Sequence, residues 1–181
     1  MPRNKYIYAV VLLFILGAWF SDFRTPSAPK PKGVVQEPTR IVTNIEDLGV
    51  NRHDWRAGGK CNIEFINGTS MDEKPYFIGR EGGLILTGWA LDEKKRRLPT
   101  SVLIRFADNK NNKEFFAKTQ IGIKRPDVQA YFRLPTHLVA SGFHLITFLK
   151  DIALGEYDIT LLTLYPDDAY ICSNGRKINV K

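Results

Sequence analysis

The residues best equipped for chemistry in this 181-residue chain are its two cysteines, Cys61 and Cys172, which stand near the two ends of the region after residue 40. An even pair in an otherwise cysteine-free chain is typical of a disulfide bond in an oxidising compartment. In the chain-entropy model, closing so long a loop stabilises the fold by about 4–5 kcal/mol. We therefore predict a disulfide between Cys61 and Cys172 that ties the first and last strands; two unrelated buried thiols are the alternative.

The remaining chemistry-bearing residues form no recognisable catalytic or metal-binding motif. His53, His137 and His144 are scattered, without the spacing of metal ligands, and the chain has no C-x-x-C, G-x-S-x-G or P-loop sequence. Asp167 and Asp168 are adjacent acids in a predicted turn. We expect no catalytic residue, no metal site and no cofactor, so that the protein is not an enzyme. The alternative is a small envelope hydrolase whose two carboxylates come from distant parts of the sequence.

The charge distribution argues against a nucleic-acid partner. The formal net charge is +7, but residues 1–40 contribute +4 of it, from six basic and two acidic side chains. Residues 41–181 hold 20 basic and 17 acidic side chains, a balance too even for a nucleic-acid-binding domain. The run from Lys94 to Arg97 is the local exception. We predict a solvated hairpin loop there, with contact to an anion or a lipid headgroup as the alternative.

An apolar stretch without any charge, residues 6–20 (YIYAVVLLFILGAWF), opens the chain. It follows Arg3 and Lys5, as in a secretion signal or a signal anchor. No pair of small residues suited to signal cleavage comes after it, and Trp19 and Phe20 are typical of a membrane interface. We predict a retained transmembrane helix over residues 6–23; a cleaved signal and a buried core helix are the alternatives.

The predicted disulfide decides the orientation of this span, because the basic residues on its two sides nearly balance. Four prolines within residues 21–40 predict a semi-rigid stalk. The predicted organisation is a cytoplasmic N-terminus (1–5), a transmembrane signal anchor (6–23), a proline-rich stalk (24–40) and an exported domain (41–181).

The exported domain is predicted to be mainly β. Short segments rich in β-branched and aromatic residues recur between glycine, asparagine and aspartate turns, without alternating helices. In Ser101–Ala107, the side chains of Val102, Ile104 and Phe106 share one face. We predict an antiparallel β-sandwich, Ig-like or jelly-roll-like, with one or two short helices. The expected strands are Cys61–Asn67, Pro75–Gly79, Leu84–Leu91, Ser101–Ala107, Glu114–Ile121, Phe143–Leu149, Tyr157–Leu164, Tyr170–Ser173 and Lys177–Val180.

Two local signals refine this fold prediction. The dipeptide Asn174-Gly175 lies between two short strand-like runs, which favours a type I′ hairpin turn. A helical turn is expected at Asp127–Arg133, and Asp127 is the residue type that caps a helix N-terminus.

Three short motifs follow one another along the domain: GWALD at residues 88–92, RPDV at 125–128 and SGF at 141–143, with LGEY at 154–157 before another strand. Their order and spacing resemble an accessory β-sandwich module of bacterial cell-envelope glycan proteins, over about residues 83–164. The resemblance implies a non-catalytic role, often beside glycosyltransferases, although no enzyme domain is attached here.

The residue types within these motifs favour structural roles. Trp89 is expected to fill the sandwich core, with a sugar-stacking platform as the alternative. Gly88 would let that bulky ring lie against a close backbone. Arg125 and Asp127 are expected to pair with each other and hold a loop, with polar recognition of a sugar or a partner loop as the alternative.

These observations predict a non-enzymatic, membrane-anchored binding or scaffolding subunit of a bacterial cell-envelope system, related to glycans. Its expected partners are the membrane, through the single N-terminal span, and an envelope protein or a glycan. The predicted location is the bacterial inner membrane, with the C-terminal domain periplasmic or extracellular. The main alternative is a structural subunit of an envelope protein machine that acts through protein–protein contacts.

Overall fold

The computed structural model describes residues 37–51, 54–71 and 76–181, and Gln36–Lys181 form one compact unit. The predicted N-terminal span over residues 6–23, most of the predicted stalk and His53 lie outside the described residues. In the part of the chain that is described, no helix is both long and apolar enough to cross a membrane.

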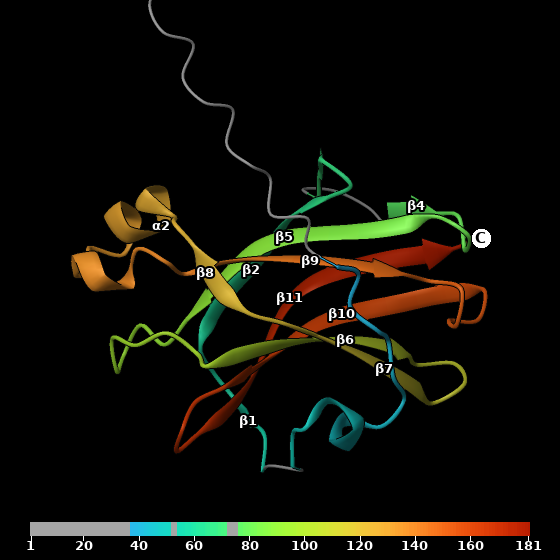
Figure 1. Cartoon of the computed structure of the whole chain (residues 1–181), viewed down its shortest axis with the longest axis horizontal. Helices are drawn as coiled ribbons and strands as arrows, with labels where there is room; N and C mark the ends of the chain where they lie inside the picture. Colours follow the sequence, from blue (N-terminus) through green and yellow to red (C-terminus); the bar gives the residue numbers. More distant parts are fainter. Residues whose placement is uncertain (1–36, 52–53, 72–75) are drawn as a thin grey trace, which may run out of the picture. The chain divides into compact units, whose positions relative to one another are not determined.

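The domain is mainly β, as predicted, and its strands form two sheets that are dominated by antiparallel pairing (Figure 1). Sheet A has the strand order β3-β2-β5-β9-β8, and sheet B has the order β1-β11-β10-β6-β7, with β4 also paired to β11. Sheet A consists of β2 (Lys60–Ile66), β3 (Thr69–Ser70), β5 (Gly83–Leu91), β8 (Ile121–Ile123) and β9 (Gly142–Phe148). Sheet B consists of β1 (Arg56–Ala57), β4 (Tyr76–Ile78), β6 (Ser101–Asp108), β7 (Lys113–Thr119), β10 (Gly155–Leu164) and β11 (Ala169–Val180).

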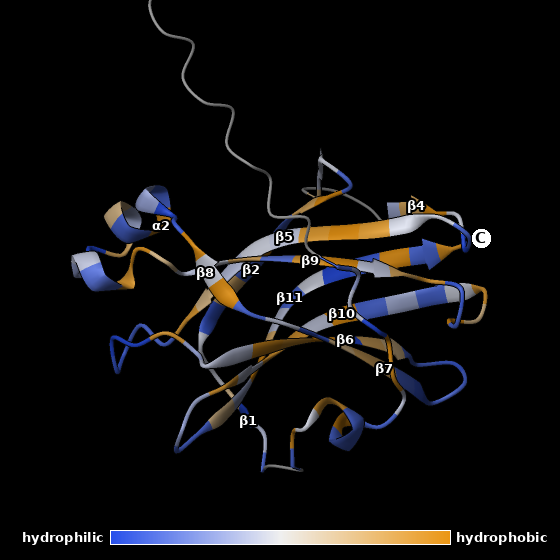
Figure 2. Cartoon of the chain, viewed as in Figure 1, coloured by the Kyte–Doolittle hydropathy of each residue, from blue (hydrophilic) through white to orange (hydrophobic). Residues whose placement is uncertain are grey.

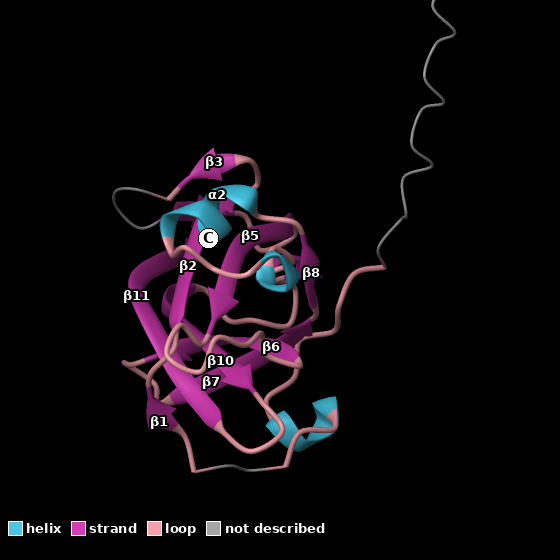
Figure 3. Cartoon of the chain, turned by 90° about the vertical axis from the view of Figure 1, so that its left-hand side faces the viewer, coloured by secondary structure: helices cyan, strands magenta, loops and turns pink. Residues whose placement is uncertain are grey.

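Three short helices complete the described fold: the 3-10 helices η1 (Ile45–Leu48) and η2 (Thr136–Leu138), and the α-helix α2 (Pro126–Tyr131). Figures 1 and 3 both draw β5 and β8 above β6 and β7, with α2 beside the upper layer. Among the strands of the described residues, β1 and β4 pair in parallel, each with β11, and the other strand pairs are antiparallel.

The main core lies between the two sheets. Side chains from sheet A, such as Ile63 and Leu84, and from sheet B, such as Phe106 and Leu161, belong to one buried cluster. The predicted inward face of the Ser101–Ala107 strand is confirmed, because Val102, Ile104 and Phe106 all lie in this cluster and are fully buried. Burying a side chain of this size stabilises a fold by about 1.5–3 kcal/mol.

Sheet B also buries much of its outer face. Leu103 and Leu162 point away from the main core into a second cluster, which residues 42–50 and Trp55 help to cover. A strand that is buried on both faces needs apolar residues at successive positions. This explains why β6 is an almost continuous apolar run rather than a strict alternation.

The sandwich is closed on one side by the predicted disulfide, which is confirmed. Cys61 on β2 and Cys172 on β11 are bonded, with a Cα–Cα distance of 6.2 Å, and the bond joins sheet A to sheet B. Beside it, the Asn174 side chain donates to Oδ1 of Asn62, at 3.3 Å.

Residues 39–42 bridge the two sheets at a different place. Thr39 pairs with Thr147 on β9 of sheet A, and its carbonyl accepts a hydrogen bond from the Thr147 hydroxyl at 2.6 Å. Val42 then exchanges backbone hydrogen bonds with Phe116 on β7 of sheet B, at 2.7 and 2.9 Å. The packed domain therefore includes Thr39, which the sequence placed in the stalk.

One of the turn predictions is wrong, and the other is confirmed only locally. Asn174-Gly175 is not a hairpin turn, because β11 runs through it: Arg176 pairs with Ile159 and Ser173 with Thr160, which leaves the dipeptide as a bulge. Gly175 keeps the positive φ of 69° that made a turn plausible, and the bulge uses that freedom instead. The run from Lys94 to Arg97 does lie in a tight turn, because Asp92 and Arg97 exchange backbone hydrogen bonds at 3.0 and 3.2 Å. Residues 92–100, which include the hydrophilic stretch 93–97 (Figure 2), do not join two paired strands, however, because they lead from sheet A into sheet B.

Candidate functional site

The three sequence motifs meet at one place on sheet A. Gly88 and Trp89 on β5 pair with Phe143 and Gly142 on β9, so GWALD and SGF lie on neighbouring strands. The segment that carries RPDV joins them through Arg125, whose N–H donates to the Val139 carbonyl at 2.6 Å. Residues that are far apart in the sequence therefore form one cluster, which we call the motif cluster.

Close backbone approach explains the two glycines of the motif cluster. A Cβ atom at Gly88 would overlap the Asn62 carbonyl oxygen and would lie 2.8 Å from Cζ of Phe143. A Cβ atom at Gly142 would lie 2.9 Å from Cγ of Arg125. Neither site has room for a side chain, so both glycines are required for packing.

The predicted Arg125–Asp127 pair is confirmed, and it is part of a larger network. Arg125 Nε donates to Asp127 Oδ1 at 2.9 Å, and Nη2 contacts the other oxygen of that carboxylate. The same guanidinium also holds Glu64 through two hydrogen bonds, at 2.7 and 3.0 Å. Glu64 was missed by the sequence analysis, because it lies 61 residues away and a register shift between Ile63 and Phe65 sets its position on β2.

Trp89 does not fill the core between the sheets, so that prediction is wrong. On β5 the inward positions are taken by Leu84, Leu86 and Ala90, and Trp89 lies on the opposite, outer face. There its indole N–H donates to Glu64 Oε1 at 3.1 Å, and its ring packs edge-on against Phe132 at 5.4 Å. Trp89 belongs to a small cluster under α2 together with Leu91, Val128, Leu134 and Leu138.

The electrostatics of the motif cluster favour a structural role over acid catalysis. The hydrogen bond from Arg125 lowers the pKa of Asp127 to about 2. The pKa of Arg125 is raised, chiefly by its hydrogen bond to Asp127. A glycosidase general acid needs a carboxyl whose pKa is raised, so that it is protonated near neutral pH. Asp127 is tuned in the opposite direction.

Asp127 does not cap the helix, in contrast to the prediction. The helix α2 begins at Pro126, with Arg125 in the N-cap position, and no side chain makes a capping hydrogen bond there. Proline is favourable in this first turn because the N–H that it lacks has no partner within the helix. Asp127 lies in the first turn and directs its carboxylate to Arg125 instead.

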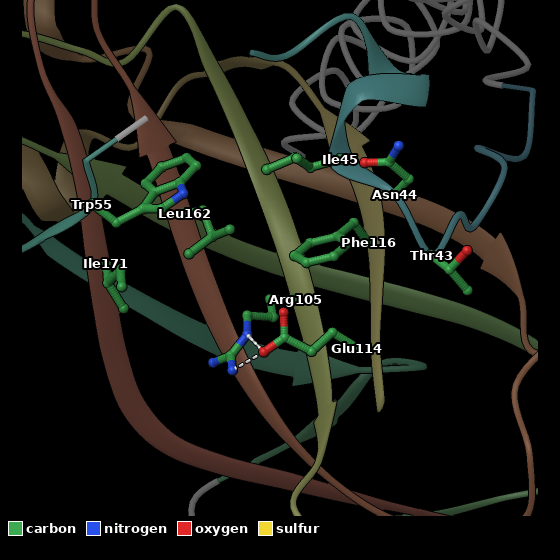
Figure 4. A pocket seen from close by; sticks show the side chains of 9 residues that line it. All are labelled: Thr43, Asn44, Ile45, Trp55, Arg105, Glu114, Phe116, Leu162 and Ile171. Atoms are coloured by element: carbon green, nitrogen blue, oxygen red, sulfur yellow. Dashed lines mark hydrogen bonds and ion pairs between the residues drawn. The ribbon is translucent and has the colours of Figure 1, made fainter. Parts of the chain in front are cut away.

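A second candidate site lies on the outer face of sheet B (Figure 4). It is a hollow of about 470 Å³. The side chains around it are Thr43, Asn44, Ile45, Trp55, Arg105, Glu114, Phe116, Leu162 and Ile171. We call it the sheet B hollow.

Apolar side chains line much of the sheet B hollow, and a charged pair lies at its edge. Trp55, Leu162 and Ile171 lie on one side in Figure 4, and the Arg105–Glu114 pair lies at the lower edge. Arg105 Nε donates to Glu114 Oε1 at 3.0 Å, and Nη2 contacts that same oxygen. Within the described residues, Arg105 Nη1 and Glu114 Oε2 make no hydrogen bond and remain available to a ligand.

Lys94, Lys95 and Arg96 are exposed, as predicted for a solvated loop, and Lys95 and Arg97 also form ion pairs with Asp168. Asp168, in the turn between β10 and β11, has a side chain that is only 6% exposed and is contacted by Arg56, Lys95 and Arg97. These cations hold the pKa of Asp168 well below its usual range, and the hydrogen bond from Lys95 makes the largest contribution. Arg97 also stacks over the Tyr165 ring, with its Cζ 4.4 Å from the ring centroid.

No metal site emerges from the described residues, where no group of three or more histidine, cysteine or acidic side chains is placed to hold an ion. His137 lies on η2 and His144 on β9, and the structure does not bring them into either candidate site. No protein-family model matches this chain, and no curated protein matches it.

Proposed function

We propose that this protein is a non-enzymatic binding subunit of a bacterial cell-envelope system and that the sheet B hollow binds a neutral glycan. The observation that carries this proposal is the combination of an apolar wall and an open polar pair within one hollow. A volume of about 470 Å³ lies within the range of small-ligand sites.

The two sides of the hollow match the two kinds of surface on a sugar ring. A pyranose has an apolar face of C–H groups, which suits an aromatic and aliphatic wall such as Trp55 with Leu162 and Ile171. Its edge carries neighbouring hydroxyls. Glu114 Oε2 accepts from one hydroxyl, and Arg105 Nη1 donates to the next.

Binding measurements on two variants test this proposal. Affinity gel electrophoresis of the full-length chain through neutral bacterial exopolysaccharides is expected to show retardation. Glu114→Gln, at a half-exposed side chain, is expected to weaken retardation about tenfold, since a charge-assisted hydrogen bond contributes about 1.5 kcal/mol or more. Trp55→Ala is expected to abolish it.

The matched control is Glu156→Gln, which removes another exposed strand carboxylate, paired with Lys177 on the same sheet but outside the hollow. It is expected to migrate like the unchanged protein. Equal retardation of all three variants contradicts the glycan proposal. The proposal is also contradicted if the unchanged chain is folded but no polysaccharide retards it or any of the variants.

The membrane anchor, the exported location and the resemblance to an accessory module belong to this same proposal. The anchor is supported by the apolar residues 6–20, and the exported location by the disulfide, which suits an oxidising compartment. The sub-class of the sandwich, Ig-like or jelly-roll-like, stays a prediction. Protease added to intact spheroplasts is expected to digest the domain; protection until the membrane is opened contradicts the orientation.

A second candidate function, contact with an envelope protein, is favoured by the outer face of sheet A. Phe65, Ile85 and Phe148 are 43%, 38% and 49% exposed on the part of this face not covered by the Trp89 cluster. The strand register places them on the same face of three adjacent strands. Exposed apolar patches of this kind often mark protein interfaces. Crosslinking in native membranes, with Phe148→Ser as the variant, distinguishes this function from glycan binding.

A further inference from the structure

A pocket of about 350 Å³ lies at the meeting point of three segments: residues 57–60, from the end of β1 to the start of β2, residues 92–95 after β5, and Tyr170 on β11. It shares no lining residue with the sheet B hollow. We propose that this pocket binds a phosphate-type anion, such as a phosphate monoester. The proposal stands independently of the glycan site.

Three lysines supply the positive charge. Lys60, Lys94 and Lys95 all line the pocket, and they come from two segments that lie 32 residues or more apart in the sequence. Lys95 is held in place by Asp168, with which it makes an ion pair. Within the described ranges, Lys60 and Lys94 form no ion pair with any carboxylate, so their ammonium groups are available to a ligand.

The acids around the pocket are mostly engaged elsewhere. Asp92 is buried, and its carboxylate accepts the Lys95 backbone N–H at 3.0 Å and Arg97 Nε at 3.3 Å. Of the two acids that line the pocket, Glu93 forms no ion pair with a described residue. Its single negative charge is outnumbered by the two positive charges of Lys60 and Lys94. An excess of positive charge therefore remains for an anion.

Two consecutive glycines and an aromatic ring complete the lining of the pocket. Gly58 packs so close to Tyr170 that an added Cβ atom would lie 3.0 Å from the ring, and Gly59 has a positive φ of 72°. The Gly58 N–H already donates to the Ile171 carbonyl at 3.1 Å, so the lysine side chains, and not a cradle of main-chain N–H groups, are expected to hold the anion. The Tyr170 ring lines the same space and offers a flat surface to the group that carries the phosphate.

Isothermal titration calorimetry of the full-length chain in neutral detergent tests the proposal at low ionic strength. The probes are inorganic phosphate, sn-glycerol 3-phosphate as a lipid-headgroup analogue, and glucose 1-phosphate as a phosphorylated sugar. All three share the proposed chemistry, and the tightest of them identifies the source. Binding is expected to weaken as salt is raised, because exposed charges are screened.

The variants are Lys60→Gln and Lys94→Gln, both at exposed positions, with Lys110→Gln in the β6–β7 loop as the control. Each of the first two is expected to raise the Kd about tenfold or more, which corresponds to about 1.4 kcal/mol. The control is expected to leave the Kd unchanged. Absence of binding for all three probes at millimolar concentration overturns the proposal. An equal Kd for Lys60→Gln, Lys94→Gln and the unchanged chain overturns it as well.

Discussion

Replacing Arg125 by alanine tests the account of the motif cluster. The substitution removes both hydrogen bonds to Glu64, at 2.7 and 3.0 Å, between side chains that are only 16% and 22% exposed. Breaking a fully buried ion pair costs about 3–5 kcal/mol, whereas an exposed pair contributes about 0.2–1 kcal/mol. A mostly shielded, bidentate pair lies between these limits, so we expect Arg125→Ala to lower the free energy of unfolding by about 2–3 kcal/mol.

The companion variant is Asp127→Asn. The Asp127 side chain is 62% exposed, so solvent screens its pairing with Arg125 and we expect a loss below about 1 kcal/mol. An isolated Arg125–Asp127 pair would give similar losses for the two changes, whereas the shielded contact of Arg125 with Glu64 separates them. Arg125→Lys keeps the charge but loses the two-pronged geometry, and an intermediate loss is expected.

Urea unfolding of the full-length chain, followed by tryptophan fluorescence, measures these differences. A double-mutant cycle of Arg125→Ala with Glu64→Gln is expected to give a coupling energy of about 1–2 kcal/mol. Lys124→Ala, next to Arg125 at an exposed position, is the control and is expected to change little. Equal losses for Arg125→Ala and Asp127→Asn, or a coupling energy near zero, would refute the reasoning.

Three further predictions concern the fold and its pH dependence. Reduction of the Cys61–Cys172 bond, which closes a loop of 111 residues, is expected to lower the stability by about 4–5 kcal/mol, seen as a lower urea midpoint with dithiothreitol. Gly88→Ala is expected to prevent accumulation of folded protein, whereas Gly122→Ala, where an added Cβ atom meets nothing within 4 Å, is expected to be tolerated; circular dichroism of the two compares them. The pKa of Asp127 is about 2 when folded against 3.8 for the free group, so its contribution is present above about pH 4 and is lost as the pH falls toward 2. Asp127→Asn is therefore expected to flatten the acid limb of a stability–pH curve, and an unchanged limb would contradict this.

Strands could be predicted from the sequence where apolar and polar residues alternate, and also where turn residues bound a short, continuous apolar run. Ser101–Ala107 is the clearest case, since both its extent and its inward residues agree with β6. The face of Trp89 could not be predicted, because apolar residues occupy both sets of alternate positions in β5: Leu84 and Leu86 on one side, Ile85 and Trp89 on the other. Only the packing of α2 against the outer face decides between them.

The candidate sites were predictable only where the interaction is local. Arg125 and Asp127 are two residues apart, and opposite charges at a helix start commonly pair. Glu64 depends on an irregular register in β2, and the Arg105–Glu114 pair depends on how β6 pairs with β7. Strand register is set by the tertiary fold, so a single sequence gives little sign of either partner.

The two closures of the sandwich differ in kind, and this gives the domain an uneven mechanical response. The disulfide between β2 and β11 holds the sheets covalently, whereas the bridge at residues 39–42 depends on a few hydrogen bonds to β9 and β7. Tension applied to the chain ahead of residue 37 is delivered to Thr39 first and reaches Val42 only after that contact yields. Under load, the hydrogen-bonded bridge at residues 39–42 is therefore expected to break first. The disulfide keeps the two sheets together, so that the bridge can form again when the load is removed.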